Sequence, residues 1–132
     1  MSHRLRIDDV SCEITPLRTR ARVQLSKAGL AHVGLASGPT TETSWQQVVA
    51  QATINAVRMF TTFAGANHKV SLINVRVATT EEPPVVVVAM TTGTGPDVKV
   101  LSGSAPLAED RYRAVAKAVL DGLNRHLELV PS

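Results

Sequence analysis

The chain has 132 residues, of which 44% are hydrophobic and only 3% are aromatic, and its formal net charge is +3. The length suits one compact domain, whereas the few aromatic side chains disfavour modules that stack nucleic-acid bases on exposed rings. No apolar run approaches the roughly 20 residues that span a bilayer. The single cysteine, Cys12, cannot form an internal disulfide, so we expect a reducing, cytoplasmic location.

The excess positive charge lies in the first quarter of the chain, residues 1–31. There the arginines Arg18, Arg20 and Arg22 alternate with other residues, which places all three on one face of a strand. Such a face is either a solvated outer surface or a surface that binds small anions or nucleic acid.

Alternating apolar and polar residues predict three strands in the first half of the chain. The first strand is expected to bend near Asp8 and Asp9, and Lys27-Ala28-Gly29 forms a turn between the second and third. Because the connections are short, the strands should form an antiparallel meander. The predicted strands cover residues 4–14, 18–25 and 31–36.

A helix is predicted after the polar segment 37–43. Its apolar residues follow Trp45 at spacings of three and four, which is one helical stripe. Ser44 is the expected N-cap, with Gln47 three residues later as in a capping box. Gly65 is the expected end of the helix.

The second half of the chain repeats this order. Strands are predicted over residues 69–78, 85–90 and 98–105, and a helix begins near Asp110, where acidic residues favour the helix dipole. The four consecutive valines of 85–88 are typical of a strand buried on both faces, which predicts a homodimer that covers one of them.

The two predicted helices carry nearly the same pattern, at 48–58 and, 66 residues later, at 114–124. We therefore predict one α+β domain, residues 1–132, built from two βββα repeats, about 4–64 and 69–129. The repeats are expected to be related by a pseudo-twofold axis, with antiparallel sheets packed against two long helices.

This duplicated pattern resembles the C-terminal regulatory domain of the 2-isopropylmalate synthase and citramalate synthase family over roughly residues 5–127. Two motifs add to the likeness: Ser37-Gly38-Pro39 is similar to an Asn-Gly-Pro turn of the family, with Ser37 in place of the Asn, and residues 118–125 are similar to a helix ending in Ala-Val-Asn-Arg. The resemblance implies a dimeric domain that binds a feedback amino acid, without the synthase reaction itself.

The candidate binding residues lie at the two strand-to-helix turns, because a helix start presents free N–H groups to a carboxylate or phosphate. The alternative is that they only cap the helices. The candidates are Ser37, Gly38, Pro39, Thr40 and Thr41 at the first turn and Ser102, Gly103 and Ser104 near the second.

No residue pattern indicates catalysis, a metal or a cofactor. The four histidines lack the spacing of a helical metal pair, and Cys12 has the setting of a small core residue. The sequence therefore predicts a non-enzymatic, homodimeric regulatory domain that senses a small carboxylate-containing ligand. Two alternatives stay open: an assembly module that binds a separate protein without a small ligand, and a weak nucleic-acid binder that uses the arginine face.

Overall fold

The computed structural model describes residues 5–63, 70–80, 82–93, 96, 98–107 and 110–129, with only the backbone at 61–63 and 125–129. It confirms the predicted order of three strands and a helix, repeated once. The first unit comprises β1 (Arg6–Ile14), β2 (Arg18–Lys27), β3 (Leu30–Pro39) and α1 (Ser44–Phe63). The second comprises β4 (Val70–Ala78), β5 (Val85–Thr92), β6 (Lys99–Pro106) and α2 (Arg111–Leu129).

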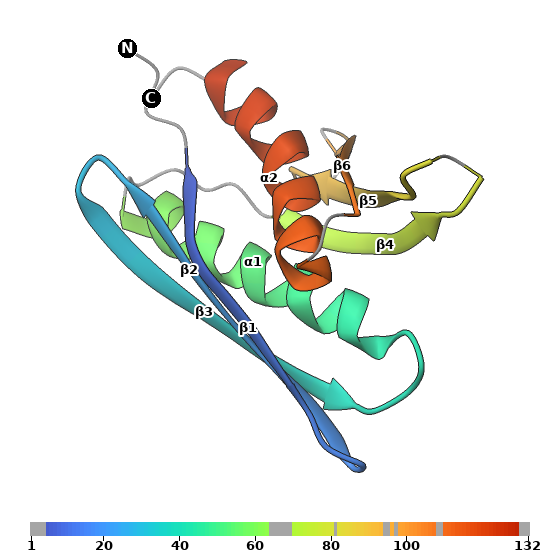
Figure 1. Ribbon diagram of the computed structural model, residues 1–132. Helices are drawn as coiled ribbons and strands as arrows, with labels where there is room; N and C mark the ends of the chain where they lie inside the picture. The colour runs from blue at the N-terminus through green and yellow to red at the C-terminus, as the bar shows by residue number, and fades with distance from the viewer. Residues whose placement is uncertain are drawn as a thin grey trace.

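Each unit forms its own antiparallel sheet, β1-β2-β3 (sheet A) and β4-β5-β6 (sheet B), and the two helices lie between the sheets (Figure 1). The strands alternate as their sequences predict. On β2, for example, Ala21, Val23 and Leu25 are buried, whereas Arg20 and Arg22, which alternate with them, are exposed. The alternation directs one face of each sheet toward the helices and leaves the other outside.

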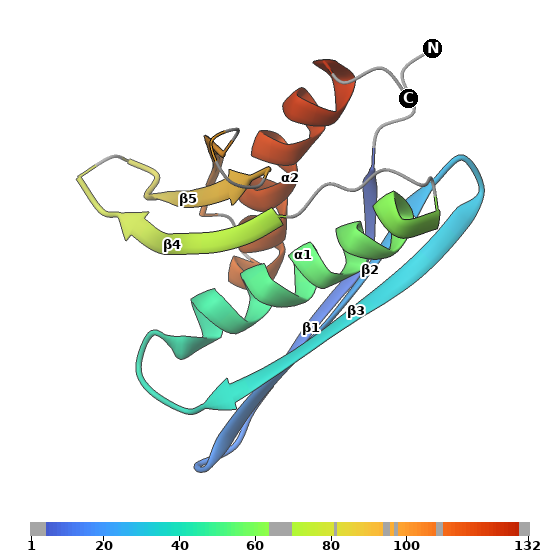
Figure 2. The same cartoon turned by 180° about the vertical axis from the view of Figure 1, so that it is seen from behind.

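The core is built where the helices meet the inner faces of the sheets (Figure 2). The buried face of helix α1 is wider than the predicted apolar stripe. The reason is that α1 packs on β2 and β3 and also contacts α2 and β4. On β5 the side chains of Val86 and Val88 are 0% exposed, while Val85 and Val87 on the outer face are half-buried.

The two units match in details that the sequence pattern does not reveal. Strand β1 has a bulge between Ile7 and Asp9, where a bend is predicted, and β4 has one at the corresponding place between Leu72 and Asn74. A β-bulge inserts one residue and bends its strand. The shared bulge therefore bends the first strand of each unit at the corresponding place.

Each helix also forms hydrogen bonds with the backbone where the other unit begins: Val70 is the first residue of β4, and Leu5 directly precedes β1. Arg58 of α1 donates a hydrogen bond to the Val70 carbonyl oxygen of β4. At the corresponding position of α2, Asn124 accepts from the Leu5 backbone N–H at 3.2 Å and donates to the Leu5 carbonyl oxygen at 3.4 Å. These two contacts, the junction clamps, hold the units together symmetrically.

Two local predictions, those of the two binding turns, are wrong in their boundaries. Ser37, Gly38 and Pro39 are the last residues of β3 and not a turn, because β3 stays paired with Thr19 and Arg18 of β2. Proline is tolerated at this strand end, where its missing N–H costs least.

The second binding turn is also a strand. Ser102, Gly103 and Ser104 all lie within β6, paired with β5. The predicted helix end at Gly65 lies outside the described residues.

Candidate functional site

The start of α1 is capped differently from the prediction. The Ser44 backbone N–H donates to the Thr41 hydroxyl at 3.1 Å, and the Thr41 backbone N–H donates to the Ser44 hydroxyl at 2.9 Å. This is the reciprocal geometry of a capping box, three residues earlier in the chain than the predicted pair of Ser44 and Gln47. A ligand at this turn would find the Ser44 N–H already bonded.

Thr40 has a structural role beside this cap. Its hydroxyl donates to the Thr15 carbonyl oxygen at 2.7 Å and lies 3.0 Å from the Thr19 hydroxyl. Because a hydroxyl has one proton to donate, the Thr19 hydroxyl donates to Thr40. Thr40 thus ties the segment before α1 to the β1–β2 turn, and it does not line the neighbouring cleft.

A cleft of about 470 Å³ lies between β3, α1 and β4, and we call it the amide cleft. Four of the five residues predicted at the first turn line it, and Thr40 is the exception. Among the described residues, none that lines it is charged; its polar members are Ser37, Thr41, Thr43, Ser44, Gln47 and Gln51. The apolar members include Val48, Leu72 and Ile73, so the cleft joins residues of both units.

The glutamines of the amide cleft were not predicted as site residues. Gln47, Gln51 and Asn55 follow each other at spacings of four on one face of α1. The Gln51 side-chain amide donates to Asn55 at 3.0 Å, and Asn55 donates to the Leu35 carbonyl oxygen of β3 at 2.8 Å. The regular spacing was visible in the sequence, but it is equally typical of a solvated face.

A second cleft, of about 410 Å³, occupies the corresponding place between β6, α2 and β1, and we call it the charged cleft. Of the residues predicted at the second turn, Ser104 lines it and Ser102 and Gly103 do not. Gly103 is buried, because β6 lies so close to α2 that an added Cβ would meet the Ala118 carbonyl oxygen. The missing side chain at Gly103 therefore allows β6 to pack closely against α2.

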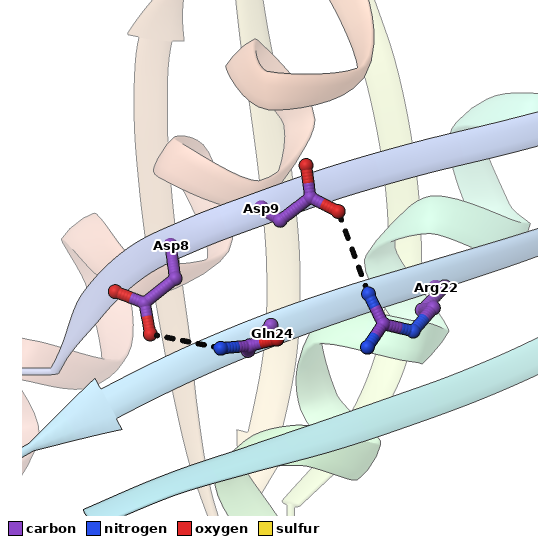
Figure 3. Close-up of polar contacts among 4 residues, drawn as sticks. All are labelled: Asp8, Asp9, Arg22 and Gln24. Carbon is purple, nitrogen blue, oxygen red and sulfur yellow. Dashed lines mark hydrogen bonds and ion pairs between the residues drawn. The ribbon is translucent and has the colours of Figure 1, made fainter.

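The arginine face does not form a purely basic surface. Arg22 makes an ion pair with Asp9 at 3.4 Å, and Gln24 donates to Asp8 at 3.4 Å on the same outer face of sheet A (Figure 3). Arg20 stands opposite Glu13 in the strand register. Opposite charges therefore alternate across this face, and exposed pairs of this kind contribute little energy.

Cys12 has no sign of activation. Partial burial raises the pKa of its thiol above the ordinary value, although the positive charge of Arg111 acts in the opposite direction. A raised pKa keeps the thiol protonated, whereas a nucleophile needs thiolate. Among the described residues, no three His, Cys, Asp or Glu side chains gather as they would around a metal ion.

No protein-family model matches the chain, and no curated protein is significantly similar to it in sequence. In the described part of the chain, neither helix is long and apolar enough to cross a membrane.

Proposed function

We propose that the chain is a cytoplasmic, non-catalytic regulatory domain that binds a small ligand in the amide cleft and forms a homodimer. The observation that carries the proposal is the position of the cleft. Because β3 and α1 of one unit and β4 of the other line it, a ligand there would contact both units and favour one arrangement of them. A ligand that binds one conformation more tightly shifts the population toward it.

The lining of the cleft supports a small ligand with a polar end and an apolar part. Its volume lies within the 300–1,000 Å³ range usual for ligand pockets. The side-chain amides of Gln47 and Gln51 can donate to a carboxylate, while Val48 and Leu72 offer apolar contact. The amides are better placed than the helix start for this, since Thr41 already caps the first turn.

The likeness to the regulatory domain of the 2-isopropylmalate synthase and citramalate synthase family agrees with this proposal. It rests on the repeated βββα order, which the structure also has. The likeness makes branched-chain amino acids and keto acids the first compounds to test.

The decisive experiment is a thermal-shift and calorimetry screen of the full chain with amino acids, keto acids and nucleotides. A ligand of the cleft should raise the melting temperature. Gln47→Ala, which removes an exposed donor from the cleft, should weaken binding by about tenfold. Gln46→Ala, on the same helix but outside the lining, is the matched control. If no compound raises the melting temperature, the ligand function is refuted.

A second candidate, an assembly module without a small ligand, is favoured by the outer face of sheet B. Val85 and Val87 lie on its middle strand, and Val100 of β6, opposite Thr91, is 70% exposed. A partner that covered this face would remove apolar surface from water, at roughly 25 cal/mol per Å². Self-association without any ligand response would favour this reading, and strongly salt-dependent binding to nucleic acid would favour the arginine face instead.

A further inference from the structure

The charged cleft differs from the amide cleft in one row of side chains. Arg113, Lys117 and Asp121 follow each other at spacings of four along α2 and all three line the cleft. They occupy the positions that Gln47, Gln51 and Asn55 hold on α1. The two clefts therefore share a framework, but one presents neutral amides and the other presents two cations and a carboxylate.

The interactions of these three residues leave positive charge available. Arg113 donates one N–H of its guanidinium to the Ile7 carbonyl oxygen at 3.1 Å, which fixes the group at the mouth of the cleft. Arginine has five N–H donors, so others remain. Lys117 is exposed, and within the described part of the chain no hydrogen bond or ion pair holds its ammonium group. Two cations at a spacing of four repel each other on a helix.

Asp121 offsets only part of this charge. Its carboxylate accepts a hydrogen bond from the Ser104 backbone N–H at 3.0 Å, beside the cleft. The row thus keeps one net positive charge. The rest of the lining is largely apolar and comes from β1, β6 and α2: Leu5, Ile7, Ala105, Pro106 and Leu120.

We infer that the charged cleft is a second binding site, distinct from the amide cleft, for a monocarboxylate with a short aliphatic part. The planar guanidinium of Arg113 suits a carboxylate, with which arginine can form two parallel hydrogen bonds. Lys117 supplies the second positive charge, and the aliphatic part contacts Ile7 and Leu120. A doubly charged phosphate fits less well, because it would face the carboxylate of Asp121 and would leave the apolar lining uncovered.

The test titrates the full chain with sodium butyrate and, separately, with inorganic phosphate, and follows both by two-dimensional NMR. Butyrate is expected to bind and to shift the signals of Arg113, Lys117 and Ser104, and these shifts report on the charged cleft whether or not the signals of Gln47 and Gln51 in the amide cleft also move. Phosphate is expected to bind more weakly. This outcome is independent of the amide cleft, so either site can fail alone.

Three variants sharpen the test. Lys117→Gln, at an exposed position, should weaken butyrate binding by about tenfold, whereas Arg76→Gln on the outer face of sheet B removes the same charge elsewhere and should change it less than about twofold. Asp121→Asn keeps an acceptor for the Ser104 N–H but removes the negative charge, so it should strengthen binding several-fold, roughly the reverse of a like-charge effect.

The inference is overturned if butyrate leaves the signals of the charged cleft unchanged. It is also overturned if Lys117→Gln and Arg76→Gln weaken binding equally, because the anion would then respond only to total charge. Phosphate that binds as tightly as butyrate would likewise contradict a carboxylate site.

Discussion

Gly34 and Gly103 lie at corresponding places, each in the third strand of its unit and each against a helix. A Cβ on Gly34 would overlap the Ala52 carbonyl oxygen and the Ala56 nitrogen of α1. These are backbone atoms, so no side-chain rotation can relieve the overlap. The absence of a side chain is what allows strand and helix to approach so closely.

We expect Gly34→Ala to lower the free energy of unfolding by more than about 3 kcal/mol, because strand and helix must separate. Gly38→Ala is the control: its Cβ would lie 3.4 Å from a Val48 methyl group, an ordinary contact, so its effect should stay within about 1 kcal/mol. Urea denaturation of both variants checks this. Equal losses would show that the close approach in β3 is unimportant for stability.

Cys12 allows a prediction about pH. Because burial raises the pKa of the folded thiol, the protonated form stabilises the fold at and below the ordinary thiol pKa, and this contribution is lost as the pH rises through the higher folded-state value. Wild type should therefore lose more unfolding free energy than Cys12→Ala between neutral pH and strongly alkaline pH. Parallel denaturation curves of the two proteins at both pH values measure it, and an equal loss would contradict the shift.

At the scale of elements, the β2–β3 hairpin turns through only two residues, Ala28 and Gly29, and both have positive φ angles of 53° and 85°. This is the backbone of a type I′ turn, which matches the twist of the strands and favours Asn-Gly. Alanine is strained there, since its Cβ crowds the following carbonyl group.

Ala28→Asn should therefore raise the free energy of unfolding by about 1 kcal/mol. The matched control is Ala31→Asn, an exposed position in β3 just after the turn, where asparagine has no conformational advantage. Thermal and urea denaturation of the two variants distinguish a specific turn effect from a general one. A destabilised Ala28→Asn would mean that the turn backbone differs in solution.

The number, order and faces of the elements were predictable because they follow from hydrophobic periodicity, which is local information. The ends were not. β3 continues through Ser37 and Gly38, whose turn-forming preference is overridden by pairing with β2. Asp110, predicted in the first turn of α2, instead precedes the helix and caps it by accepting from two backbone N–H groups, at 3.1 and 3.0 Å.

The candidate site was predicted in part. The predicted segment does line a cleft, but Gln51 and Lys117 gain their significance only when β4 and β1 of the opposite units close the clefts beside them. The contacts between the two units arise only in the tertiary fold, so the sequence pattern of one repeat does not reveal them.

At the scale of the whole molecule, both sheets leave their outer faces without a covering layer in the described part of the chain. The outer face of sheet B has the valines of β5 at its centre, whereas the outer face of sheet A has its arginines and acids. This difference makes sheet B the expected surface for self-association.

We expect the wild-type chain to sediment as a dimer at micromolar concentration and Val87→Arg, at the centre of that outer face, to sediment as a monomer. The buried charge would oppose association, since it would lack a partner. Val33→Arg, the same change on the outer face of sheet A, should leave the dimer intact. A monomeric mass for wild type in analytical ultracentrifugation would rule out the dimer.

The junction clamps relate the two units as the subunits of a symmetric dimer are related, but here within one chain. In an assembly of identical subunits, one mutation would alter both clefts together. When both units belong to one chain, a substitution in one cleft leaves the other cleft unchanged. Both junction clamps end on backbone groups of the opposite unit, so each unit can mutate separately while they persist. The glutamines of α1 and the charged residues of α2 stand at corresponding positions, so a duplicated chain can carry two chemically different clefts on one framework.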